Sequence, residues 1–355
     1  MSLAAEYFTK DHFSAPANYE EQKELFRNSV SNVVVEISSF CNRHCTYCPI
    51  SQVDRSSSNR LLPDEIFNKL VDDLERIDYA ESVCLNLYNE PMSDRELLLS
   101  RISLLRQRLP KCRIYFSTNG DYLSREYLKA AVDAGLSELY VTLHAPKGKP
   151  YDDAYVIGRI SELSARLGKA IKVTSVAMNQ NIYGTISLFG IKIHVFSTNY
   201  AIYGSDRAGA MTDITARTPA RKAPCDRPFH DFTISYEGTL FPCCQMFVDN
   251  PMHKKKYSVG NLASYSNIYE AYASQAMAGW RKSMLRFGPK ESPCDTCSEA
   301  DGEGTREEIT ARDQVYRSLI GEIPEGEKEV AYPVGTDDHH ATINRFRKLL
   351  KGLTG

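Results

Sequence analysis

Short apolar segments alternate with amphipathic helical patterns from residue 33 to residue 196, and this alternation sets the fold class. In the helix expected after Pro63, for example, Ile66, Leu70 and Leu74 recur at helical spacing. Strands that alternate with helices form parallel α/β sheets, with their functional sites at the carboxyl ends of the strands. We therefore expect an α/β fold with a partial (βα)6 barrel. The six predicted strands cover residues 33–38, 82–87, 112–117, 138–143, 171–176 and 191–196.

The alternation stops near residue 210, which predicts a second, smaller domain. Residues 232–244 predict a hairpin that turns at Glu237 and Gly238, and a helix is expected over about 266–285. Residues 298–340 are rich in Glu, Gly and Asp and predict an exposed linker. The expected division is a lead-in at 1–32, the barrel at 33–210, a small hairpin-plus-helix domain at 211–300, and at 301–355 a linker with a C-terminal helix at 341–350.

Composition narrows the class of protein. Hydrophobic residues make up 42% and charged residues 25% of the 355 residues, as in soluble globular proteins. A net charge of −2 gives no reason to expect nucleic-acid binding. The chain has no apolar run long enough for a membrane span, and its first residues lack a secretory signal pattern. We therefore expect a cytoplasmic protein without a membrane partner.

Ten cysteines stand out in this composition. In a chain of this length without a secretory signal, they indicate metal binding or catalysis rather than disulfides. Cys41, Cys45 and Cys48 follow the first predicted strand with the spacing C-x3-C-x2-C. Three thiolates suit a [4Fe–4S] cluster with one open iron, whereas zinc normally takes four ligands and would need another, such as His44. The spacing alone leaves both interpretations open.

A second group of cysteines lies in the C-terminal domain. Four of them have the pattern C-x17-C…C-x2-C, and four thiolates can close a zinc site or a [4Fe–4S] cluster equally well. The members of this group are Cys225, Cys243, Cys294 and Cys297. The other cysteines are expected to be packed or solvent-facing thiols without a ligand role: Cys84, Cys112 and Cys244.

Three further motifs follow or end the predicted strands. YNEP follows the second strand, STNG the third, and VTLHA ends the fourth. Together with the first cysteine loop, and with Tyr47 before its last cysteine, these segments resemble the radical SAM superfamily. The resemblance implies a partial barrel whose loop cysteines hold a [4Fe–4S] cluster, with S-adenosylmethionine (SAM) bound at the open iron.

The same resemblance implies a SAM site. Glu90 of YNEP would receive the SAM amino group, while Tyr88 and Asn89 stand where the family has glycines. Thr142 offers a hydroxyl to the SAM carboxylate or ribose, and the SDRAG segment contributes Arg207. The predicted SAM-contacting residues are Tyr47, Tyr88, Asn89, Glu90, Pro91, Thr118, Asn119, Thr142 and Arg207.

Three residues are candidates for taking up a proton at the barrel mouth. Glu36 alternates with Val34 and is expected to face the mouth, although a structural ion pair is the alternative. His144 stands where the family usually has an acid. Arg207, from the segment after the last predicted barrel strand, is the third.

The C-terminal hairpin, helix and late cysteine pair resemble the SPASM/twitch extension of radical SAM enzymes. The resemblance implies that the four cysteines of this domain hold an auxiliary [4Fe–4S] cluster. No cysteine follows Cys297, so the domain is similar to the shorter twitch form with one auxiliary cluster.

These resemblances predict a radical SAM oxidoreductase that abstracts hydrogen with a 5′-deoxyadenosyl radical. The predicted reaction is a two-electron oxidation of a small sugar- or aminocyclitol-like substrate in natural-product biosynthesis, with a reducing partner such as flavodoxin or ferredoxin. The first alternative is a peptide-modifying enzyme that forms crosslinks or thioethers or epimerises residues, and an epimerase would need a hydrogen donor such as Cys244. A zinc-binding adaptor without catalytic activity is the alternative of another class.

Overall fold

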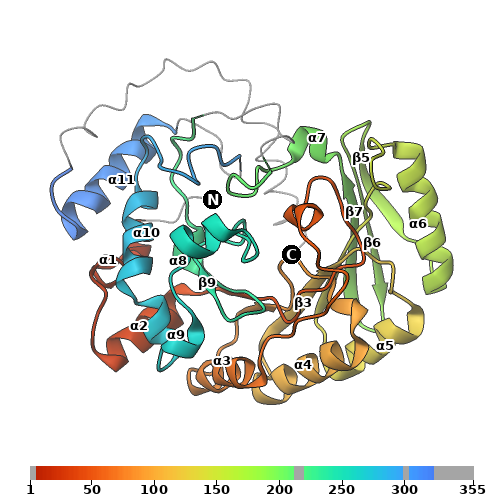
Figure 1. Cartoon of the computed structure of the whole chain (residues 1–355), viewed down its shortest axis with the longest axis horizontal. Helices are drawn as coiled ribbons and strands as arrows, with labels where there is room; N and C mark the ends of the chain where they lie inside the picture. Colours follow the sequence, from red (N-terminus) through yellow and green to blue (C-terminus); the bar gives the residue numbers. More distant parts are fainter. Residues whose placement is uncertain (1–4, 212–219, 299–303, 324–355) are drawn as a thin grey trace.

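One sheet of nine strands runs through the residues that the computed structural model describes, which are 5–211, 220–298 and 304–323 (Figure 1). The strand order is β5-β6-β7-β4-β3-β2-β1-β8-β9. Strands β1 to β4, β7 and β8 pair in parallel, whereas β6 is antiparallel to β5 and β7, and β9 is antiparallel to β8. The strands are β1 Asn32–Val35, β2 Ser82–Cys84, β3 Arg113–Thr118, β4 Glu138–Thr142, β5 Lys172–Ala177, β6 Asn181–Leu188, β7 Ile191–Thr198, β8 Asp231–Ile234 and β9 Leu240–Phe241.

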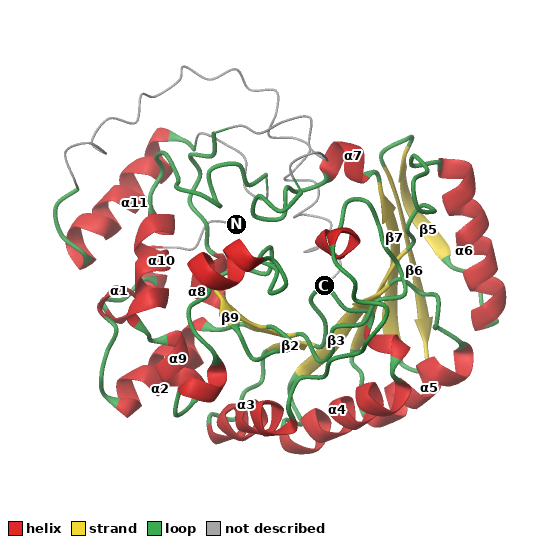
Figure 2. Cartoon of the chain, viewed as in Figure 1, coloured by secondary structure: helices red, strands yellow, loops and turns green. Residues whose placement is uncertain are grey.

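Helices α3 to α6 lie on the outer side of the curved sheet (Figure 2). Within the described ranges, no helix has the length and apolar character needed to cross a bilayer. The helices are α1 Asp11–Ser14, α2 Tyr19–Ser29, α3 Asp64–Arg76, α4 Arg95–Arg108, α5 Arg125–Ala134, α6 Asp153–Leu167, α7 Tyr200–Tyr203, α8 Arg227–His230, α9 Ile268–Tyr272, α10 Gln275–Leu285 and α11 Arg306–Leu319.

The period-two geometry of the strands separates the core from the site. In β3, Ile114 and Phe116 belong to the buried apolar core, whereas Tyr115 and Ser117 line an internal cavity. Strand β1 follows the same rule, because its Val33 and Val35 are core residues while Asn32 and Val34 line the cavity. Alternation along a strand therefore decides which side chains can reach a ligand.

The α/β class is confirmed, but the strand count of the (βα)6 barrel needs a correction. The segment between the fifth and sixth predicted strands, to which no element was assigned, is strand β6, which pairs antiparallel with β5 and β7. Its buried residues Ile182, Ile186 and Leu188 recur at even spacing, which is typical of a strand. Phe189 and Gly190 join β6 to β7 with φ of 53° and 87°, the left-handed conformation of a tight hairpin turn.

Helix boundaries follow local capping chemistry. The side chain of Ser124 caps α5, and Gly135 ends that helix with φ 117°. At α4 the cap is Asp94 rather than its neighbour Ser93. The Asp94 carboxylate accepts from the first turn of the helix, while the Ser93 hydroxyl donates to the carbonyl of Glu90 over 2.7 Å.

The C-terminal hairpin is confirmed, with Gly238 at φ 78° in its turn. Strand β8 also pairs with β1, so the hairpin extends the barrel sheet. The helix expected over 266–285 is two helices, α9 and α10, because the Ser274 side chain caps a new helix start. Part of the expected linker is helix α11, whose capping box of Thr305 and Glu308 stabilises its first turn. The helix expected at 341–350 lies outside the described residues.

Candidate active site and iron–sulfur sites

A cavity of about 390 Å³ opens at the carboxyl ends of β1 to β4 and contains most of the predicted site. Cys41, Cys45 and Cys48, which we call the loop cysteines, line it. Of the predicted SAM-contacting residues, only Pro91 is not part of its lining. The predicted residues that line it are Tyr47, Tyr88, Asn89, Glu90, Thr118, Asn119, Thr142, His144 and Arg207. The structure thus brings motifs from four strand ends to one place.

Polar contacts fix the cysteine loop to the loop after β3. Arg43 donates to both carboxylate oxygens of Asp121 over 2.6 Å, and Asn42 donates to the same carboxylate over 2.9 Å. The side-chain oxygen of Asn42 also accepts from the side-chain amide of Asn119 over 2.8 Å. A bidentate arginine–carboxylate pair fixes orientation as well as distance. Asp121 is therefore an anchor of the loop that sequence reasoning missed, although it directly follows the STNG motif.

Glu90 joins the YNEP and STNG motifs. Its carboxylate accepts from the Thr118 hydroxyl and the backbone amide of Asn119, both over 2.7 Å, and from the backbone amide of Met92 over 3.0 Å. Burial raises the pKa of Glu90 to about 7, and these hydrogen bonds oppose the rise. The side chain is thus held in one orientation at the cavity wall.

We expect Glu90→Gln to weaken SAM binding about tenfold to a hundredfold, because hydrogen bonds to charged groups contribute roughly 1.5–3 kcal/mol. Equilibrium dialysis of SAM against the reconstituted protein measures this, with iron content recorded on the same sample. Glu96→Gln is the matched control, because Glu96 is exposed in the first turn of α4. Unchanged SAM affinity in Glu90→Gln would remove Glu90 from the SAM site.

Tyr47, His144 and Tyr200 form an aromatic wall of the cavity. The rings of Tyr47 and Tyr200 stack with centroids 4.0 Å apart, and the Tyr47 hydroxyl lies 2.5 Å from Nδ1 of His144. Burial, with a smaller contribution from the charge of Arg43, lowers the pKa of His144 to about 3. The imidazole is therefore neutral, and its Nδ1 is engaged by the Tyr47 hydroxyl.

Arg207 lies in a loop with unusual backbone geometry. Arg207, Ala208 and Gly209 have φ of 51°, 56° and 80°, and a left-handed conformation is uncommon for the two non-glycine residues. The Arg207 guanidinium donates to the Gln245 side chain over 2.9 Å, and the Ser205 hydroxyl donates to the same oxygen over 2.9 Å. This loop therefore contacts both the cavity and the C-terminal domain.

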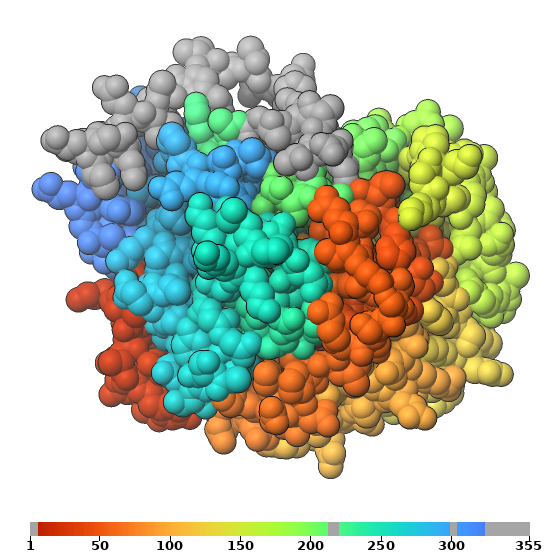
Figure 3. Space-filling view, viewed as in Figure 1, coloured from red at the N-terminus to blue at the C-terminus, as the bar shows by residue number. Residues whose placement is uncertain are grey.

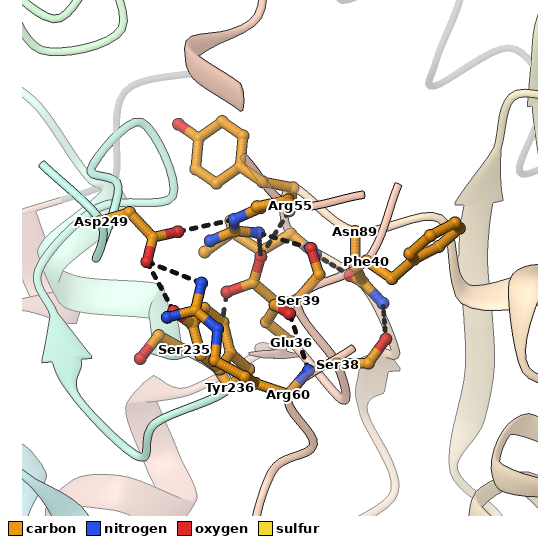
Figure 4. Close-up of polar contacts among 12 residues, drawn as sticks. Glu36, Ser38, Ser39, Phe40, Arg55, Arg60, Asn89, Ser235, Tyr236 and Asp249 are labelled. Atoms are coloured by element: carbon orange, nitrogen blue, oxygen red, sulfur yellow. Dashed lines mark hydrogen bonds and ion pairs between the residues drawn. The ribbon is translucent and has the colours of Figure 1, made fainter. Parts of the chain in front are cut away.

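The expectation that Glu36 faces the barrel mouth is wrong. Glu36 is fully buried and is absent from the cavity lining. Its carboxylate accepts from the Arg55 guanidinium over 2.6 Å, and from the backbone amides of Tyr88 and Tyr236 over 3.2 and 3.3 Å (Figure 4). The physical reason is Arg55, a buried cation 19 residues later in the chain. It forms with Glu36 the structural ion pair that the sequence analysis gave as the alternative.

Arg55 extends this pair into the C-terminal domain. It also donates to the Asp249 carboxylate over 2.6 Å, and its guanidinium lies 4.6 Å and 4.9 Å from the ring centroids of Phe247 and Tyr236. Figure 3 shows the teal C-terminal segment lying directly against the orange-red cysteine-loop region. The Glu36–Arg55–Asp249 network therefore holds the loop region and the C-terminal domain together.

We expect Arg55→Met to lower the free energy of unfolding by about 3–5 kcal/mol, because it leaves the Glu36 charge buried without its partner. Arg60→Met is the matched control. Arg60 contacts the same Asp249 over 3.2 Å but its side chain is 46% exposed, so about 0–1 kcal/mol is expected. Urea unfolding midpoints of the two variants test this, and equal losses would contradict it.

The cavity also has polar residues nearer the amino ends of the strands, which the motifs did not indicate. Asp231 accepts from Asn32 over 3.2 Å and from Arg227 over 3.2 Å, and the Tyr115 hydroxyl donates to Asn32 over 2.9 Å. Burial opposes ionisation of Asp231, but the hydrogen bond from His230 and the charge of Arg227 hold its pKa below the ordinary value. An ionised carboxylate therefore lies in the cavity.

A second, smaller cavity contains Cys225, Cys243, Cys294 and Cys297, which we call the auxiliary cysteines. Arg227 lines both cavities, and the neighbours Cys243 and Cys244 divide between them, with Cys244 facing the larger one. Cys84 lines the larger cavity too, while Cys112 belongs to the apolar core, as expected. The two cysteine sets therefore lie on opposite sides of a wall that includes Arg227.

The donor sets fit iron–sulfur clusters. Each set gathers thiols around one cavity, and thiolates are the ligands of [4Fe–4S] clusters. Among the described residues, no three His, Cys, Asp or Glu side chains meet closely enough to hold a single metal ion. The three loop cysteines would leave one iron of such a cluster open, whereas zinc normally takes four ligands.

Comparison with known proteins agrees with these sites. Residues 35–178 match the radical SAM superfamily, and residues 225–298 match the iron–sulfur cluster-binding SPASM domain. The S-adenosyl-L-methionine-dependent 2-deoxy-scyllo-inosamine dehydrogenase of Niallia circulans is 24% identical over 270 residues, which are 76% of this chain and 92% of that protein. The crystal structure of BtrN in complex with AdoMet and 2-DOIA has a TM-score of 0.53 at 20% identity, over 78% of this chain and 95% of BtrN. At this identity the structural likeness shows the fold.

The fold and the two cysteine-lined cavities thus define a radical SAM enzyme. The chain belongs to the radical SAM superfamily and carries a SPASM-type C-terminal domain. It is a radical SAM iron–sulfur oxidoreductase whose cofactors are [4Fe–4S] clusters and SAM.

Proposed function

We propose that this enzyme oxidises a hydroxyl group of a small aminocyclitol- or sugar-like molecule to a carbonyl by two electrons. The observation that carries the proposal is a cavity lined by the SAM motifs at the strand ends and, nearer the amino ends of the strands, by the polar side chains of Asn32 and Asp231. A cavity of about 390 Å³ suits a small ligand more than a protein segment. The aminocyclitol dehydrogenase among the relatives supports the same substrate class.

We assign roles to the residues accordingly. The loop cysteines hold the SAM-binding cluster, and Glu90, Thr142 and Arg207 contact SAM. When bound, SAM and its cluster supply a 5′-deoxyadenosyl radical that removes hydrogen from an unactivated carbon. Asn32 and Tyr115 orient the substrate hydroxyls beside Asp231 in the same cavity.

Asp231 replaces the three earlier candidates as proton acceptor. Glu36 does not reach the cavity, Nδ1 of His144 already lies 2.5 Å from the Tyr47 hydroxyl, and a guanidinium such as Arg207 keeps its proton. The Asp231 carboxylate is ionised and lines the cavity, so one of its oxygens takes the hydroxyl proton as the carbonyl forms.

We also propose a cytoplasmic location and a flavodoxin- or ferredoxin-type reducing partner, without nucleic-acid or membrane partners. Support for the location comes from the cysteines of the described residues, none of which forms a disulfide. We propose the domain division near residue 210 as well, because the alternation of strand and helix gives way there to cysteine-bearing loops.

Anaerobic turnover with deuterated candidates tests the substrate class. Aminocyclitols and sugars that carry deuterium at the hydroxyl-bearing carbons are incubated with reduced enzyme and SAM, and 5′-deoxyadenosine is analysed by mass spectrometry. We expect deuterium in 5′-deoxyadenosine and an equal amount of ketone product from at least one aminocyclitol. Deuterium transfer from a peptide, and from none of these molecules, would contradict the proposal.

A further inference from the structure

The cavity of the auxiliary cysteines has an unusual charge. Two arginines, Arg221 and Arg227, line it, and no carboxylate of the described residues does. The larger cavity differs, because Glu90 and Asp231 line it beside its arginines. Among the described residues, the charged side chains that line the cavity of the auxiliary cysteines are therefore cations.

Arg221 is the more deeply buried of these cations, with 4% of its surface exposed. Its guanidinium donates to the carbonyls of Ala223 and Pro224 over 3.0 and 2.6 Å. Its backbone amide donates over 2.7 Å to the carbonyl of Asp295, between the last two auxiliary cysteines. It lines this cavity together with Cys225, Cys294 and Cys297.

A buried charge is costly unless an opposite charge lies near it. A [4Fe–4S] cluster with four thiolate ligands is an anion, and it gains one more negative charge when it is reduced. A cation next to it stabilises the reduced form more than the oxidised form, and the low dielectric of a buried site strengthens this difference.

We propose that Arg221, assisted by Arg227, raises the reduction potential of the auxiliary cluster and so prepares it to accept the second electron of substrate oxidation. The acceptor role rests on the proposed function, whereas the potential itself is a property of the resting protein. In the balanced reaction, the substrate radical loses one electron to this cluster and one proton to a base, and the carbonyl bond forms.

Arg227 contributes less than Arg221. Its guanidinium lies 3.2 Å from the Cys244 sulfur and 3.2 Å from the Asp231 carboxylate, so a nearby anion balances part of its charge. Its side chain is also 33% exposed, which allows water to screen it.

The test is a redox titration of the anaerobically reconstituted full chain, followed by electron paramagnetic resonance. The SAM-binding cluster is recognised by the change of its spectrum when SAM is added. We expect Arg221→Gln to shift the auxiliary midpoint potential to a lower value, Arg227→Gln to shift it less, and Arg221→Lys to keep it close to that of the unmodified protein. Unchanged potentials in both glutamine variants would overturn the proposal.

Arg281→Gln is the matched control. Arg281 is fully buried and donates to three backbone carbonyls, but it lines neither cavity. We expect this variant to unfold more easily and to keep the auxiliary potential, and an equal shift in Arg281→Gln would overturn the proposal. If the Arg221→Gln variant does not assemble the auxiliary cluster, the other two variants test the proposal. A lowered midpoint potential in Arg227→Gln and a retained one in Arg221→Lys support it, whereas an unchanged potential in Arg227→Gln overturns it. Because no substrate is present, the expected shifts can occur even if aminocyclitol oxidation fails, which separates this inference from the proposed function.

Discussion

Replacing the three loop cysteines together by alanine is expected to abolish reductive cleavage of SAM and to lower the iron content from about eight to about four per chain. All three thiols line the larger cavity beside Glu90 and Tyr47. Without them, the cavity has no thiolate set that can hold a cluster with an open iron. The auxiliary cysteines lie in a separate cavity, so their cluster should remain. Iron analysis and the yield of 5′-deoxyadenosine after reduction with dithionite measure the two effects.

Cys112→Ala is the control for this variant, because Cys112 is a buried cysteine of the apolar core that lines neither cavity. It should keep the full iron content and the cleavage of SAM. Formation of 5′-deoxyadenosine by the triple variant would show that SAM binds elsewhere, and would refute the assignment of the loop cysteines.

Local chemistry made much of the fold predictable. The ends of α5 depend on the Ser124 side chain and on Gly135, and both effects lie within one helical turn. Strand β6 was not predicted, because its pairing with β5 and β7 in the folded sheet, rather than its own sequence, defines it as a strand. Gly184 also interrupts its apolar pattern, and a side chain there would meet Ile171 at 2.9 Å. The sequence of such a strand carries a weaker signal than its packing does.

The candidate site divides in the same way. Residues such as Glu90 and Thr118 were predictable because they belong to contiguous motifs at strand ends. Asn32 and Asp231 were missed because they are neighbours only through the pairing of β1 with β8, across 199 residues. The position of the Glu36 side chain was predicted wrongly for a related reason. Its alternation with Val34 indicated the barrel mouth, but only the folded chain shows that Arg55 lies against the Glu36 carboxylate.

Replacing Cys294 and Cys297 by alanine is expected to abolish the oxidised product while SAM cleavage continues. After hydrogen abstraction, an alcohol substrate must still lose a proton and an electron before it becomes a carbonyl. Asp231, the proton acceptor that we propose, lines the larger cavity, and Arg227 lines both this cavity and that of the auxiliary cysteines. Loss of two of the four thiolates removes the acceptor site for the electron, but it leaves the loop cysteines and Glu90 in place. Chromatography of one reaction quantifies both 5′-deoxyadenosine and ketone.

The Cys244→Ser variant tests whether Cys244 is a ligand of the auxiliary cluster or only a neighbour of its ligands. Cys244 directly follows an auxiliary cysteine but faces the larger cavity, so this variant should keep about eight irons per chain.

The outcome that contradicts a dehydrogenation is a product at the oxidation level of the substrate, with solvent deuterium on the carbon that lost hydrogen. Such a product needs no electron acceptor, so it would form in the Cys294→Ala, Cys297→Ala variant as well. Its dependence on Cys244 would then identify this thiol as the hydrogen donor of an epimerase.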